Sequence, residues 1–215
     1  IKFVGSLDVT SPESAGIVWN VGETNKVISW DSNGTITNVN IYYRTSAGGS
    51  DNTIVLNDGS HVNGGNSYTW TSAVPDEKTE TAYIKVADAA HPTDIYSVST
   101  VPFSIRPVIT VTVPALDQNI EVGTSNNTVT WSINSAKVTK TDIYYSTNGQ
   151  AGPFNQLISS GINTTPGSNS YATWGPVADT LGGDIVIKVR DKSSDVINDN
   201  VFGLSPSFDI IGKIT

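Results

Sequence analysis

Two aspartates at matching places in this sequence come nearest to a chemical site. Asp88 and Asp191 each follow an Ile-Lys-Val motif by two residues, and further aspartates come soon after both. Two carboxylates are enough for glycoside hydrolysis, and oxygen-rich loops hold Ca²⁺ with about six to eight ligands. The spacing matches no regular calcium loop, so the alternative is that each aspartate caps a turn. The weak candidates for a calcium site are Asp88, Asp94, Asp191, Asp195 and Asp199.

The two histidines offer little more. His61 and His91 both lie in polar loop sequence of the first half, and the second half has no counterpart. They could ligate a metal or act as a base, but we expect them to be surface loop residues. Serines abound without a Gly-x-Ser-x-Gly motif or a plausible histidine partner. We therefore predict no enzyme, no catalytic residue and no cofactor.

Matched lysines and tyrosines lie on strand-like segments. Alternation places Lys85 and Lys188 on an outer sheet face, where solubility and edge protection explain them. An isopeptide bond from such a lysine to an asparagine would need burial, which this exposure argues against. Tyr42 and Tyr144 also point outward. A carbohydrate platform would need several such rings in one plane, so we interpret these two as ordinary sheet-surface residues.

Composition narrows the class of protein. The 215 residues carry a net charge of −8, and both halves are acidic, which argues against nucleic acid as a partner because phosphates would be repelled. There is no cysteine, hence no disulfide framework, and no apolar run long enough for a membrane span. Val, Ile, Tyr and Trp alternate with Asn, Ser, Thr, Gly and Asp, which is strand-and-turn usage.

The strands that would position these residues occur twice. The segment VGETNKVISW ends at Trp30, and VGTSNNTVTW ends at Trp131, 101 residues later. Ile28 and Trp30 fall two apart, as do Val129 and Trp131, so each pair shares one face of a strand. A large aromatic there predicts a plug in the core of a β-sandwich. The predicted core residues are Trp30, Trp131, Tyr43, Tyr145, Trp70 and Trp174.

Each half holds seven or so short strands separated by Gly, Asn and Pro turns, which predicts an all-β protein made of two tandem immunoglobulin- or fibronectin-III-like β-sandwiches. One strand differs in length between the halves. Ser67-Tyr68-Thr69-Trp70 becomes Ser170-Tyr171-Ala172-Thr173-Trp174. One extra residue would turn the tryptophan to the other face unless a bulge absorbs it, so we predict a β-bulge near Ala172.

The domain boundaries follow from the repeat. We expect sandwiches over residues 5–106 and 107–211, with 1–4 and 212–215 as the edges of neighbouring repeats in a longer array. Arg106 and Pro107 alone would link the two sandwiches, and proline fixes one φ. This linker predicts a stiff, end-to-end rod.

These motifs carry a family resemblance. The strings Gly5 to Pro12, Trp19 to Gly22, Ile36 to Tyr43 and Ile84 to Asp88 resemble the immunoglobulin-like repeat of the Ser-Thr-rich GPI-anchored membrane protein family, which is related to the N-terminal module of fungal cell-wall synthesis proteins and occurs in prokaryotic surface proteins. The second half departs by having Ile120 where the first has Trp19. The resemblance implies an extracellular β-sandwich with a structural or adhesive role and no catalytic residues.

We therefore predict an extracellular or cell-surface structural protein whose tandem repeats form a stalk, surface layer or filament. Its partners would be neighbouring repeats or further copies of itself, with no nucleic acid. The alternative is an adhesin or a carbohydrate-binding accessory module. Glycans could decorate the three Asn-x-Ser/Thr sequons, which begin at Asn33, Asn126 and Asn163.

Overall fold

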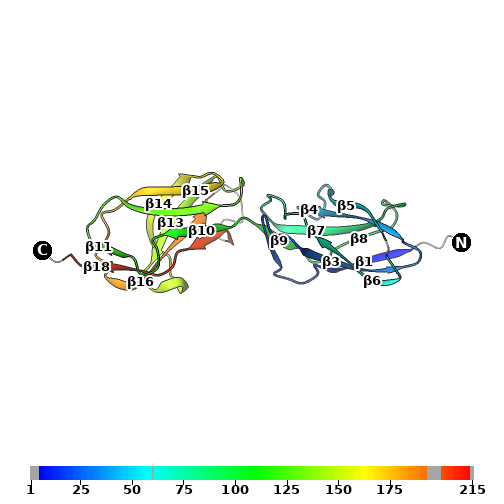
Figure 1. Ribbon diagram of the computed structural model, residues 1–215, viewed down its shortest axis with the longest axis horizontal. Helices are drawn as coiled ribbons and strands as arrows, with labels where there is room; N and C mark the ends of the chain where they lie inside the picture. Colours follow the sequence, from blue (N-terminus) through cyan, green and yellow to red (C-terminus); the bar gives the residue numbers. More distant parts are fainter. Residues whose placement is uncertain (1–4, 60, 193–199, 214–215) are drawn as a thin grey trace. The chain divides into compact units, whose positions relative to one another are not determined.

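The computed structural model describes residues 5–59, 61–192 and 200–213. The chain divides into two compact units, unit 1 (Ile1–Arg106) and unit 2 (Pro107–Thr215), each built of strands (Figure 1). The predicted fold class is confirmed, because each unit is a β-sandwich of two sheets. Unit 2 also contains a short 3-10 helix, η1 (Gly149–Ala151).

Unit 1 pairs a three-stranded sheet with a larger one. The strand order is β1-β3-β6 in the first sheet and β2-β9-β7-β4-β5 in the second, where β8 also pairs with β7. Its strands are β1 (Ser6–Ser11), β2 (Val18–Asn20), β3 (Lys26–Asn33), β4 (Asn38–Arg44), β5 (Asn52–Gly59), β6 (Gly64–Trp70), β7 (Thr79–Asp88), β8 (Tyr96–Val98) and β9 (Phe103–Arg106).

The first strand of the sandwich is split between the two sheets. β1 pairs antiparallel with β3, and β2 then crosses over to pair parallel with β9. Pro12 follows β1 directly and has no N–H to offer a ladder, so pairing in the first sheet ends there. This crossing ties the two sheets together at one edge, as in immunoglobulin-like sandwiches.

Unit 2 repeats the same topology. Its sheets have the orders β10-β12-β15 and β11-β18-β16-β13-β14, with β17 also on β16, and β11 again pairs parallel with the last strand. Its strands are β10 (Ile109–Val113), β11 (Asn119–Glu121), β12 (Asn127–Ile133), β13 (Lys140–Ser146), β14 (Gln156–Asn163), β15 (Gly167–Trp174), β16 (Gly182–Asp191), β17 (Phe202–Leu204) and β18 (Phe208–Ile211).

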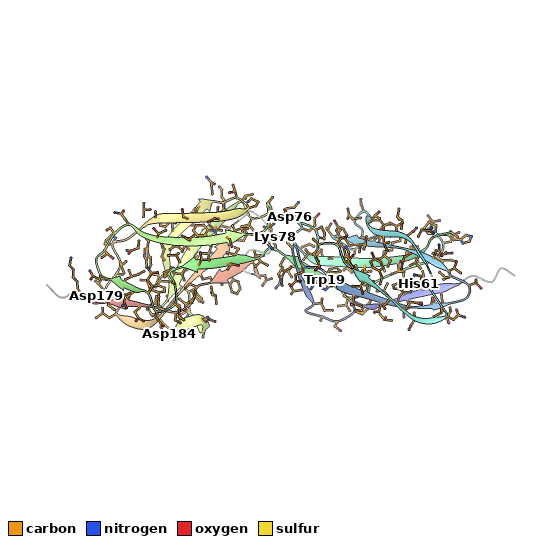
Figure 2. The ribbon with its side chains drawn as sticks, viewed as in Figure 1. Trp19, His61, Asp76, Lys78, Asp179 and Asp184 are labelled. Carbon is orange, nitrogen blue, oxygen red and sulfur yellow. The ribbon has the colours of Figure 1, made fainter. Side chains whose placement is uncertain are left out.

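Trp30 and Trp131 are completely buried at matching places in the two cores. Their indole Nε1 atoms have no hydrogen-bond partner among the described residues, so it is the apolar area of the ring that holds each in place. In unit 1, Trp19 and His61 lie toward opposite ends of the sandwich (Figure 2). Of the other predicted core residues, Trp70, Trp174 and Tyr145 are buried, and Tyr43 is partly buried with its ring stacked on Trp70.

The predicted bulge in unit 2 is confirmed. Asn127 pairs with Trp174 and Val129 pairs with Tyr171, so three steps along β15 oppose two along β12. The corresponding pair in unit 1, β3 with β6, runs without a shift. Because the bulge absorbs the extra residue, Trp174 keeps the same inward direction as Trp70.

Candidate functional site

Asp88, at the end of β7, turns its carboxylate into the loop that follows. Its Oδ1 accepts the backbone N–H of Ala90 at 3.2 Å, and its Oδ2 lies 2.9 Å from Nδ1 of His91. The imidazole is 52% exposed, as expected for a surface loop. With Asp94 and Thr35, these residues line a pocket of about 390 Å³. An aspartate that accepts the N–H two residues on stabilises a turn, which gives the Asp88 carboxylate a structural use.

The other calcium candidates, Asp191, Asp195 and Asp199, belong to unit 2. Asp191 is fully buried at the end of β16, and its N–H donates to Val201 O at 2.9 Å. Asp195 and Asp199 lie outside the described residues. Across residues 5–59, 61–192 and 200–213, no three His, Cys, Asp or Glu side chains are grouped so that they could hold a metal ion. A calcium site therefore stays a prediction, with no ligand set assembled for it.

His61 departs from the expectation of a surface loop residue. Its side chain is only 7% exposed, and the ring packs edge-on against Trp30 with 4.9 Å between centroids. Its Nε2 lies 3.0 Å from Asp58 Oδ2. The loop folds back over β3, where the Ser32 hydroxyl donates to Val62 O at 2.7 Å. A hydrogen bond between residues so far apart in sequence has no local signal, so the polar composition of the loop was misleading.

Lys85 lies on the predicted outer face but is 9% exposed, so the expectation of a solvated lysine was wrong. Its Nζ lies over the rings of Tyr96 and Tyr42, at 4.8 and 5.5 Å from their centroids. The same ammonium donates to Asp51 Oδ2 at 2.7 Å. Neighbouring side chains cover the lysine because its long apolar stem packs along rings while its charge finds a carboxylate.

Because Lys85 is buried, an isopeptide bond from its amine has to be considered. The residue that Lys85 contacts argues against such a bond. Lys85 meets the Asp51 carboxylate instead of an asparagine amide. Burial by itself would raise the pKa of Asp51, but hydrogen bonds from Arg44 and Lys85 outweigh it and hold that pKa below its usual value. Condensation with an amine needs a neutral carboxyl group, so this ionised pair is a salt bridge.

The outward tyrosines serve as partners for cations of their own sheet. Lys85 covers Tyr42, and the Arg190 guanidinium lies 4.9 Å from the centroid of the Tyr144 ring. Lys188 in unit 2 matches Lys85, and its Nζ lies 4.1 Å from the Phe202 centroid. Cations thus lie over the rings of Tyr42, Tyr144 and Phe202 and compete with a sugar for these ring faces.

Asp142 is the charged site that the sequence analysis missed. It lies on β13 with no exposed surface, and it accepts the Ser160 hydroxyl at 2.6 Å and the Gly161 N–H at 2.9 Å. Arg190 and Lys192 lie 3.3 and 3.5 Å from Oδ2. Burial would raise the pKa of Asp142, yet these hydrogen bonds, with the Lys192 charge, hold it below its usual value.

In unit 1 an uncharged side chain makes the corresponding hydrogen bond to the edge strand. Asn40 occupies the equivalent place on β4, and its Oδ1 accepts the Asn57 N–H at 2.9 Å. Asn57 and Gly161 both have positive φ, at 59° and 68°, and each lies where β5 or β14 shifts register. The side chain therefore fixes a bulge in the edge strand of each unit. An alignment of the two halves would have singled out Asp142, because Asp142 pairs with Arg190 whereas the equivalent Asn40 pairs with Ala87.

The three sequon asparagines, Asn33, Asn126 and Asn163, are all exposed. Asn33 ends β3, Asn163 ends β14, and Asn126 lies in the turn before β12. Attachment of a glycan at any of them would displace no core side chain. Glycosylation at these sites stays a prediction.

No protein-family model matches this sequence, and no curated protein matches it significantly. Solved structures with some likeness include a chimeric titin Z1Z2-Z1Z2 tandem, at 15% identity and a TM-score of 0.29 over 99% of both chains. Titin A168169 has 11% identity and a TM-score of 0.36 over 98% of both chains. The N-terminal four Ig domains of Dscam1 isoform 6.9 have 12% identity and a TM-score of 0.30, over 98% of this chain and 48% of that one. The resemblance to the Ser-Thr-rich GPI-anchored family therefore stays a prediction.

Proposed function

We propose that this chain is an extracellular structural protein whose tandem immunoglobulin-like units are links of a stalk, surface layer or filament. The observation that carries the proposal is the connection between the units. β9 ends at Arg106 and β10 begins at Ile109, so Pro107 and Val108 alone join one sandwich to the next. Proline has one fixed φ, and so short a connection has little freedom compared with a flexible linker.

The charged clusters support a structural role. The carboxylates of Asp51, Asp88 and Asp142 each accept hydrogen bonds that hold a turn, a bulge or a sheet face of their own unit. These bonds give each carboxylate a structural use within its own unit. No helix within the described ranges is long and apolar enough to cross a membrane.

The outer strands β5 and β14 disfavour lateral addition of a foreign strand at their own edges. β5 and β14 are the outer strands of their sheets, and both are bulged at the residue that Asn40 or Asp142 holds. Bulges hinder pairing with a foreign strand. The segment Ile1 to Val4, which we expected to be the edge of a neighbouring repeat, lies outside the described residues.

A binding role, as an adhesin or a carbohydrate-binding accessory module, is the alternative. A polar, aromatic-lined groove in unit 2 favours it. The two roles are compatible, since a rod can present a binding site along its length.

Electron microscopy of the native material tests the structural proposal. Fibres or a lattice with a repeat equal to one immunoglobulin-like unit would support it. Dispersed particles holding one copy of the chain, with no further units attached and no order between them, would contradict it. Denaturation and renewed assembly of the same material provide the control, because an ordered deposit caused by drying would not form again in solution.

A further inference from the structure

Unit 2 has a groove between the edge strands of its two sheets, β14 and β15, and we call it the β14–β15 groove. It has a volume of about 250 Å³. Tyr145 and Trp174 contribute buried rings, Tyr171 is partly exposed, and Gln156 and Thr173 are exposed polar residues of the lining. Among the residues that the structure describes, no charged side chain lines it. The groove thus combines the partly exposed ring of Tyr171 with neutral hydrogen-bonding groups.

The bulge in β15 lies beside this groove, because residues on both sides of the inserted Ala172 line it. The register shift falls between Tyr171 and Trp174, and Thr173 lines the groove. In unit 1, where the strand has no insertion, Tyr43 and Trp70 stack at 25° between ring planes. In unit 2 the matching rings, Tyr145 and Trp174, are tilted by 45°. The unit that has the bulge therefore has a larger angle between the two matching ring planes.

Tyr171 is held in place within the groove. Its ring packs against the hydrophobic core of unit 2. The side chains of Thr173 on β15 and Ser159 on β14 favour its ionised form and lower the pKa of Tyr171. A ring that is already packed loses little freedom when a ligand stacks on it.

We propose that the β14–β15 groove binds a sugar residue of a neutral glycan. The C–H face of a pyranose packs on an aromatic ring, and its hydroxyls need neutral donors and acceptors, which Gln156 and Thr173 supply. The absence of charge in the lining excludes the strong ion pairs that acidic sugars or phosphates would seek. The site is additional to the proposed structural role and does not depend on it.

The test is an amide NMR titration of the whole chain with a panel of neutral hexoses, N-acetylhexosamines and their short oligomers, and with uronic acids as a separate arm. Saturable shifts at Gln156, Tyr171 and Thr173 with a neutral sugar are expected. Gln156→Ala and Thr173→Ala should each weaken binding about fivefold, the usual effect of one lost hydrogen bond. The matched changes in unit 1, Asn52→Ala and Thr69→Ala, should leave it unchanged.

Deletion of Ala172 offers a stricter test, because it restores the strand length of unit 1. Loss of binding with an otherwise preserved spectrum is expected, and if the deletion unfolds unit 2 the two alanine variants decide. Any of three results would overturn the proposal: no saturable shift with any neutral sugar, shifts that survive both alanine variants, or binding by uronic acids alone.

Discussion

Among single residues, Asp142 shows how one sandwich can hold a bulge with a charge while its neighbour uses an amide. Asp142 is fully buried, and Arg190 stands opposite it on β16. The equivalent Asn40 in unit 1 faces Ala87. A buried carboxylate without a cation would destabilise the fold. The aspartate in unit 2 is therefore accompanied by an arginine, and both are replaced by uncharged residues in unit 1.

Replacement of Asp142 by Asn should therefore destabilise unit 2 by about 1.5–3 kcal/mol at neutral pH, the range for a hydrogen bond to a charged group. The folded-state pKa of Asp142 is lowered, so its contribution is present above the ordinary value of about 3.9 and is lost as pH falls through the folded-state pKa. Hydrogen exchange resolved by unit should show the gap between wild type and Asp142→Asn closing in acid. Equal protection at neutral pH would contradict this account.

The reverse substitution is the matched control. Asn40→Asp places a carboxylate opposite Ala87 with no arginine there, so it should weaken unit 1 at neutral pH and recover as the new carboxyl group is protonated. Stability that is unaffected by pH would show that the site in unit 1 is open to water.

Lys85 leads to a second residue-level prediction. Lys85→Ala removes the salt bridge to Asp51 and the stem that packs on Tyr42 and Tyr96, so unit 1 should lose about 1–2 kcal/mol in a denaturant titration. The exposed Lys213 is the control, and its removal should cost little. The intact mass of the wild-type chain should show no loss of water, because the pair is ionic. A mass lower by one water would reveal an amide bond instead.

Among the strands, the bulged edges of β5 and β14 are the feature with the clearest energetic test. Gly161 has a φ of 68°, where a side chain is strained, so Gly161→Ala should cost unit 2 about 1–2 kcal/mol. Asn57→Gly in unit 1 should be close to neutral, since asparagine already tolerates its φ of 59°. Thermal unfolding monitored by circular dichroism measures both. A larger loss for Asn57→Gly than for Gly161→Ala would contradict the assignment of the bulges.

Strand positions could be predicted because alternation is a local signal. The extra residue between Tyr171 and Trp174 was enough to locate the bulge in β15. The division of the first strand between sheets was not predicted, since the parallel pairing of Val18 with Ser104 is a contact between distant segments. Local periodicity says which residues point inward and nothing about which sheet a short strand joins.

The candidate sites were harder to predict for the same reason. His61 is covered because its loop returns over β3, and Lys85 is covered because Tyr96 arrives from β8. Alternation correctly assigned Lys85 to the outer face, but a side chain on the outer face of a sheet is not always exposed to solvent. The hydrogen bonds of Asp142 depend on a bulge whose residue, Gly161, is 19 positions away.

For the whole molecule, the proposal depends on the connection at Pro107 and Val108. If the linker is stiff, insertion of several Gly and Ser residues between them should leave both cores intact and increase only the freedom between units. Unit-resolved hydrogen exchange should therefore be unchanged in the insertion variant. A general loss of protection would show instead that the units depend on each other for stability.

Small-angle X-ray scattering of the wild-type chain in dilute solution tests the proposed stiff rod most directly. A globular chain of this length would have a radius of gyration of about 17 Å, whereas two sandwiches end to end should give roughly 25 Å. We predict the larger value, with a narrower spread of particle dimensions than in the Gly-Ser insertion variant. A radius near the globular value, or a spread equal to that of the insertion variant, would contradict the account.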